Sequence, residues 1–157
     1  RPGAKDKETA HPKFFLFDCG AVRALSGRLR EPLDSAERGT LLETLVFHEL
    51  RAHAAYSNLG GTLSYFRTPS GTEVDFVWTG GRHRVGNEVR GAARCRTEHS
   101  RTLRVLHEAK ALTSCYGVYL GDTQQQDGIV RVLPQHAFLR ELATGKILPA
   151  GRVHEGT

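Results

Sequence analysis

The feature that most restricts the fold is a hairpin pattern in residues 71–90, GTEVDFVWTGGRHRVGNEVR. Two strand-like runs flank Gly80-Gly81, and such a pair favours a tight turn between antiparallel strands. Side chains two positions apart in a strand point to the same face, so Glu88 and Arg90 share a face. The hairpin brings Asp75 beside them. Two carboxylates next to a cation are suited to holding a hard divalent metal and to handling a phosphate.

Regular elements are predicted along most of the chain by apolar spacing and by turn signals. Asp34 or Ser35 can cap a long helix that ends near Ser57. Other helices are predicted within residues 21–30 and at 98–112 and 134–142, and strands at 63–67, 73–78, 84–90, 115–120 and 129–133, with a polar loop over 121–128. Residues 13–17 are predicted to form a short buried strand or an extended entry segment. The order of a helix, three strands, a helix and a strand predicts an α/β fold, with one mixed sheet of about four to five strands flanked by helices.

The long helix carries two acids inside its apolar face. At about 100° per residue, Glu49 lies near the centre of the apolar arc and Glu43 toward its edge. Burying a carboxylate without a partner is costly, so each acid needs a cation, a hydrogen bond or a metal. Glu43 is a candidate metal ligand or the partner of Arg67 or Arg90 in a salt bridge. Asp75 has the same two interpretations, with Arg67 as its partner, while Glu49 is interpreted as tying the helix to the sheet.

Four segments together resemble a known family. They are KFFLFDCGAVRAL at residues 13–25, RGTLLETLVFHEL, YFRTPSGTEVDFVW and NEVR, within a span of about residues 13–122. The part at residues 71–90 resembles the core of the PD-(D/E)XK nuclease-like superfamily. More narrowly, the four segments together resemble the uncharacterised domain found C-terminal to an AAA-type ATPase module in bacterial and archaeal proteins. The resemblance implies a restriction-endonuclease-like fold and, as partner, an ATPase domain of the same longer chain.

The resemblance also implies a set of site residues. The superfamily places an acid on the first helix, an Asp on one strand and an acid-x-Lys on the next. Matched to this chain, the pattern implies catalytic roles for Asp75, Glu88 and Arg90, and Mg²⁺ or Mn²⁺ held by Glu43, Asp75 and Glu88. Arg90 stands where the superfamily usually has Lys. Arginine is a planar fork that clamps oxyanions, whereas lysine is a compact ammonium that can position an attacking water.

Three functions are compatible with this pattern. In the first, the domain is a metal-dependent endodeoxyribonuclease, in which the metal lowers the pKa of a bound water and stabilises charge at the scissile phosphate. In the second, the acids and Arg90 form an internal salt-bridge network, and the domain binds nucleic acid or its own ATPase without catalysis. The third, a purely structural interaction domain, leaves the buried acids unexplained.

Positive charge is concentrated in one stretch of a basic chain. The formal net charge is +5 and the sequence pI is about 9.4. The arginines between residues 82 and 104 are opposed only by Glu88 and Glu98. A solvated surface is one interpretation. The other is a set of phosphate contacts, for which arginine is suited by its bidentate geometry. The candidate nucleic-acid-binding residues are Arg82, Arg84, Arg94, Arg96 and Arg101.

Length and composition set the remaining expectations. A chain of 157 residues suffices for one domain, expected at residues 13–142 between a polar arm at 1–12 and a tail at 143–157. The absence of Met predicts a processed or excised part of a longer protein. Three cysteines without a CxxC pair argue against a disulfide framework or a zinc site and favour the cytoplasm. No apolar run approaches the roughly 20 residues that span a bilayer, and no phosphate-binding loop for ATP is present.

Overall fold

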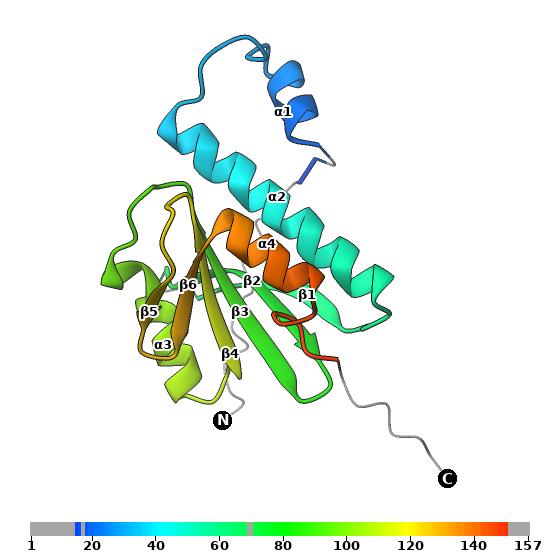
Figure 1. Cartoon of the computed structure of the whole chain (residues 1–157), viewed down its shortest axis with the longest axis vertical. Helices are drawn as coiled ribbons and strands as arrows, with labels where there is room; N and C mark the ends of the chain where they lie inside the picture. Colours follow the sequence, from blue (N-terminus) through cyan, green and yellow to red (C-terminus); the bar gives the residue numbers. More distant parts are fainter. Residues whose placement is uncertain (1–14, 17, 69–70, 151–157) are drawn as a thin grey trace, which may run out of the picture.

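A mixed β-sheet organises the residues that the computed structural model describes, namely 15–16, 18–68 and 71–150. The sheet has six strands in the order β1-β2-β3-β4-β6-β5 (Figure 1). Their bounds are β1 Thr62–Arg67, β2 Glu73–Gly80, β3 His83–Arg90, β4 Ser114–Tyr119, β5 Gln125–Asp127 and β6 Val130–Pro134. β1, β2 and β3 form an antiparallel meander, β3, β4 and β6 run parallel, and β5 returns antiparallel to β6. The predicted α/β fold with a mixed sheet is confirmed.

The strand count is higher than predicted because of β5. This strand has only three residues, all polar, and lies within the segment 121–128 that was expected to be a loop. It pairs residue by residue with β6, from Gln125 opposite Val132 to Asp127 opposite Val130. Three polar residues carry no hydrophobic alternation, so this strand is defined by its partner and not by its own sequence.

The helices follow the predicted order, with differences at their ends. Their bounds are α1 Cys19–Leu25, α2 Ser35–Tyr56, the 3-10 turn η1 Thr97–Ser100, α3 Arg101–Glu108 and α4 Gln135–Ala143. Asp34 caps α2 as predicted, because its side chain accepts a hydrogen bond of 2.7 Å from the backbone N–H of Glu37. α3 is shorter than the helix expected at 98–112, since Lys110 adopts a left-handed conformation with φ of 59°. None of the helices among the described residues is long and apolar enough to cross a membrane.

The sheet is covered on both faces. Figure 1 shows α2 and α4 over one face, where Phe76, Trp78 and Val85 belong to the same buried cluster as the apolar residues of the two helices. α3 lies on the other face, where Leu103 packs with Leu112. Both faces of the central strands are therefore buried, as is typical where helices flank parallel strands.

Buried residues extend beyond the C-terminal boundary expected for the domain. Ile147 and Leu148 lie in the predicted tail, yet each is only 1% exposed and belongs to the core beneath α2 and α4. The core therefore continues past residue 142. At the other end, Phe15 belongs to no strand and stacks on Phe47 of α2, with ring centroids 4.3 Å apart. The predicted arm at 1–12 lies outside the described residues, as does most of the segment 13–17, so the N-terminal boundary stays a prediction.

A β-bulge shapes the strand that carries Asp75. Ser64 of β1 pairs with Val77, but the next paired residue, Phe66, lies opposite Val74. Two residues of β2, Asp75 and Phe76, therefore occupy the space opposite one residue of β1. As a result Val74, Asp75 and Phe76 are all buried, in place of the alternation that a regular strand would show. Val74 packs on the α3 side of the sheet and Phe76 on the α2 side.

Candidate functional site

Glu88 and Arg90 form an ion pair near the end of β3. The Nη2 of Arg90 donates to Oε2 of Glu88 at 2.6 Å. The side chain of Glu88 is 5% exposed and that of Arg90 is 41% exposed. The guanidinium therefore covers a buried carboxylate from the solvent side. The pair comes from positions i and i+2 of one strand, whose side chains share a face as predicted.

Asp75 lies beside the same strand and bonds to its backbone. Its Oδ2 accepts a hydrogen bond of 2.7 Å from the N–H of Val89. The backbone pairing of β2 with β3 runs from Gly80–His83 to Phe76–Asn87, and one further step in this register sets Asp75 opposite Glu88. Asp75 is 8% exposed. The predicted placement of the two acids on adjacent antiparallel strands is thus confirmed, and the carboxylate of Asp75 extends the ladder where backbone pairing ends.

The start of α2 crosses the end of β3 at very close range. A Cβ added to Gly91 would lie less than 3.0 Å from the Cα and N of Gly39. Glu43 follows Gly39 by one helical turn and is partly buried, so it lies on the side of α2 that faces this end of the sheet. Glu49, expected inside the apolar arc, is exposed. The expectation that Glu49 ties the helix to the sheet is therefore wrong.

The three acids do not form a metal site in this arrangement. Across the described part of the chain, no group of three or more His, Cys, Asp or Glu side chains is placed to hold a metal ion. Glu88 binds Arg90, and Asp75 binds the backbone of β3. Arg67, considered as a partner for Glu43 or Asp75, instead pairs with Glu73 at 3.2 Å. The binding of Mg²⁺ or Mn²⁺ by Glu43, Asp75 and Glu88 stays a prediction. The contacts observed for these residues do not support it.

A small hollow lies beside the ion pair, between β3, β4 and the start of α3. Its volume of about 10 Å³ holds roughly one water molecule. Arg90, His99 and Ser100 contribute polar groups to its lining, and Leu103 contributes an apolar wall. Burial, together with the guanidinium groups of Arg90 and Arg96, lowers the pKa of His99 below its usual value. The guanidinium of Arg90 lies in this lining beside the carboxylate of Glu88.

The predicted nucleic-acid-binding arginines fall into two groups. Arg94, Arg96 and Arg101 are exposed and lie in the loop after β3 and at the start of α3. Arg82 and Arg84 lie at the opposite end of β3, in and beside the β2–β3 turn. There the Nη2 of Arg84 donates to the carbonyl oxygen of Lys110 at 2.9 Å. The structure therefore divides these arginines, which are close together in the sequence, into two groups. Lys110 lies beside the group that contains Arg82 and Arg84.

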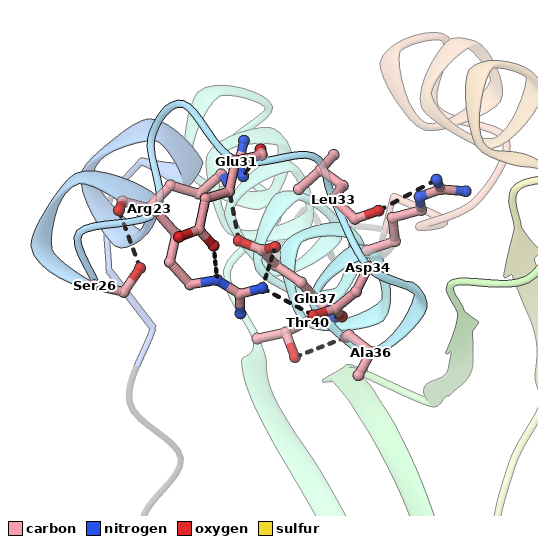
Figure 2. Close-up of polar contacts among 10 residues, drawn as sticks. Arg23, Ser26, Glu31, Leu33, Asp34, Ala36, Glu37 and Thr40 are labelled. Atoms are coloured by element: carbon pink, nitrogen blue, oxygen red, sulfur yellow. Dashed lines mark hydrogen bonds and ion pairs between the residues drawn. The ribbon is translucent and has the colours of Figure 1, made fainter.

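Ion pairs that the sequence analysis missed hold α1 against α2. Figure 2 shows Arg23 reaching Glu37, with Nε 2.9 Å from Oε1. Arg28 contacts Asp34 at 2.9 Å and Glu31 at 3.0 Å. α1 itself has no buried residue; two of its side chains contact α2, because Arg23 pairs with Glu37 and Cys19 donates from its Sγ to the carbonyl oxygen of Leu41 at 3.4 Å. The alternating charges of RLREPLDSAE were a signal for such a network.

The comparisons with known proteins identify one family. The family model described as "Domain of unknown function (DUF4143)" matches residues 38–138, which is more than half of the chain. The match begins just before Gly39, spans the whole site and ends in α4. No curated protein and no solved structure gives a significant match.

Proposed function

The chain belongs to the DUF4143 family of domains of unknown function, and we propose that it is a nucleic-acid-binding module whose acidic site is closed by an internal ion pair. The observation that carries the proposal is the contact of 2.6 Å between Arg90 Nη2 and Glu88 Oε2. A cation supplied by the protein itself occupies the position next to the carboxylate where a metal would be needed.

The chemistry of the three site residues supports a non-catalytic role. Mg²⁺ and similar hard cations require oxygen ligands that are free to coordinate. Here the carboxylate of Glu88 is neutralised by Arg90, and that of Asp75 accepts the N–H of Val89. Arginine stays protonated and prefers bidentate oxyanion contacts, so it is a poor substitute for a lysine that positions water. The pair therefore fits a structural role better than a hydrolytic one.

The surface next to the closed site supports binding to phosphates. Residues 91–110 contain five cationic side chains and two acidic ones. Arg94, Arg96 and Arg101 are exposed, and no ion pair of these three is found among the described residues. Exposed arginines without acidic partners are suited to contacting a polyanionic backbone with little sequence preference.

Two parts of the proposal concern the context of the domain. The resemblance to domains that follow an AAA-type ATPase module favours a longer chain in which this module carries the nucleic-acid contact for an ATPase. We also propose that the protein is located in the cytoplasm. The competing function, a nuclease dependent on Mg²⁺ or Mn²⁺, requires Arg90 to leave Glu88.

Binding is tested by fluorescence anisotropy with a labelled duplex of DNA at two salt concentrations. We expect weak binding that differs little between unrelated sequences. If about four phosphates are contacted, affinity should fall roughly a hundredfold between about 50 and 200 mM salt, because counterions are released on binding. The absence of binding even at the lower salt concentration would overturn the proposal and leave a protein-interaction module.

A further inference from the structure

Two groups of exposed cations lie at the two ends of α3. The α3-start cluster consists of Arg94, Arg96 and Arg101, and the α3-end cluster of Arg82, Arg84 and Lys110; all six side chains are exposed. The α3-end cluster is assembled from two elements. Arg84 donates from its Nη2 to the carbonyl oxygen of Lys110 at 2.9 Å, and its backbone N–H donates to Thr113 Oγ1 at 2.9 Å. These bonds fix the β2–β3 turn against the end of the helix.

A ridge formed by the exposed side chains of α3 runs between the two clusters. The exposed side of α3 presents Arg101, Val105 and Glu108, with Val105 53% exposed. The remaining arginine of the helix, Arg104, is drawn away from this ridge by Asp127, with an ion pair of 2.5 Å. The middle of α3 therefore offers an apolar side chain, and the cations available to phosphates are at its ends.

The distance between the clusters follows from the geometry of the elements that carry them. The seven helical steps of α3, from Arg101 to Glu108, correspond to about 10 Å, at about 1.5 Å per residue. Six strand steps from Arg84 to Arg90, beside the other cluster, correspond to about 20 Å. The two groups are held at this separation by the sheet, since β3 and α3 pack together through Leu103 and Leu112 against Gly86.

We propose that this surface binds B-form duplex DNA, with α3 lying across the major groove and one cluster on each phosphate backbone. The inference rests on the proposed function and deepens it by naming the nucleic acid. A separation of about 10–20 Å is comparable to a major groove that is about 12 Å wide and admits a helix. The ridge around Val105 then faces the groove. Duplex RNA is excluded by its deep and narrow major groove, and a single strand does not supply two backbones at a fixed distance.

The test compares two cluster variants with a control of equal charge. Arg94→Gln, Arg96→Gln and Arg101→Gln remove the α3-start cluster, and Arg82→Gln, Arg84→Gln and Lys110→Gln remove the α3-end cluster. The control removes three exposed arginines from other elements, by Arg30→Gln, Arg38→Gln and Arg140→Gln. All three variants lose three positive charges. Affinity is measured by anisotropy for a duplex of DNA, the single strand of the same sequence and the duplex of RNA, over a range of salt.

Each cluster variant is expected to weaken duplex DNA binding about tenfold or more at low salt, and the control by less than about threefold. The slope of log affinity against log salt should become shallower by about one for every phosphate that the variant no longer neutralises. The unmodified protein should bind duplex DNA at least about tenfold more tightly than either other nucleic acid.

Four results would overturn the inference. These are equal binding of single strands, equal binding of duplex RNA, an effect of only one cluster, or an equal effect of the control. Each of them leaves the proposed function standing, because the protein still binds a phosphate backbone. The absence of binding to all three nucleic acids would instead overturn the proposed function itself.

Discussion

Replacing Gly91 by alanine is expected to destabilise the domain by about 3 kcal/mol, because the new methyl group would overlap the backbone of α2. The Cα and N of Gly39 and the carbonyl carbon of Arg38 all lie within 3.0 Å of the position that a Cβ on Gly91 would occupy. Backbone atoms inside a helix cannot rotate away as a side chain can. Either α2 must lift from the end of β3, or the loop after β3 must move.

Gly39 offers a matched control on the other side of the same contact. A Cβ added there would meet its nearest neighbour, the backbone N of Gly91, at 3.9 Å, which is ordinary van der Waals contact. Gly39→Ala should therefore be neutral or stabilise the helix by up to about 1 kcal/mol. Urea unfolding followed by the fluorescence of Trp78, the single tryptophan, measures both variants. Equal stability of the two variants would contradict the close crossing.

Replacing Asp75 by alanine is expected to cost about 2–3 kcal/mol, because a buried N–H on Val89 would lose its acceptor. The bond from this N–H to Oδ2 is 2.7 Å long, and Asp75 is 8% exposed. Asparagine keeps a side-chain oxygen that can accept the same bond. Asp75→Asn should therefore cost roughly 1 kcal/mol, clearly less than alanine.

The difference between these two substitutions separates the two roles of Asp75. A residue that serves the backbone of β3 tolerates asparagine better than alanine. A metal ligand loses its charge in both variants, so both would weaken the effect of added Mn²⁺ on the unfolding midpoint. If Mn²⁺ stabilises the unmodified protein and both variants abolish that gain, the structural role assigned to Asp75 is incorrect.

The parts of the fold that the sequence predicted are those with a strong local pattern. The hairpin around Gly80-Gly81 has a strand-forming run on each side of a tight turn, and α2 combines an Asp34 cap with an apolar face. β4 and β6 are short apolar runs between polar loops. In each case the local sequence pattern agrees with the final packing, and such agreement allows an element to be predicted from the sequence.

The parts that could not be predicted depend on partners far away in the sequence. β5 exists only because Gln125–Asp127 pair with β6. The bulge at Asp75 is defined by the register of β1, and the close crossing at Gly91 by the path of α2. The error at Glu49 has a different cause. A helix whose circumference is mostly apolar gives no clear centre for its buried face, so the exposed position of Glu49 was not apparent.

The candidate site shows the same division. The sharing of one face by Glu88 and Arg90 follows from strand geometry, and so does the nearness of Asp75. Whether a cation at Arg90 faces a phosphate or closes on Glu88 depends on side-chain conformation, which residue spacing does not specify. The charge cluster at residues 82–104 was likewise visible in sequence, but its division between the two ends of α3 required the fold.

The central claim is that this domain contacts DNA while its acidic site stays closed, and one incubation tests both halves. A labelled duplex is mixed at low salt with a stoichiometric amount of protein and Mn²⁺, and each sample is run on a native and a denaturing gel. The unmodified protein, Asp75→Asn and Arg90→Lys are compared. We expect a retarded complex on the native gel and intact strands on the denaturing gel for all three. Cleavage by the unmodified protein that is lost in Asp75→Asn and faster in Arg90→Lys would contradict the account.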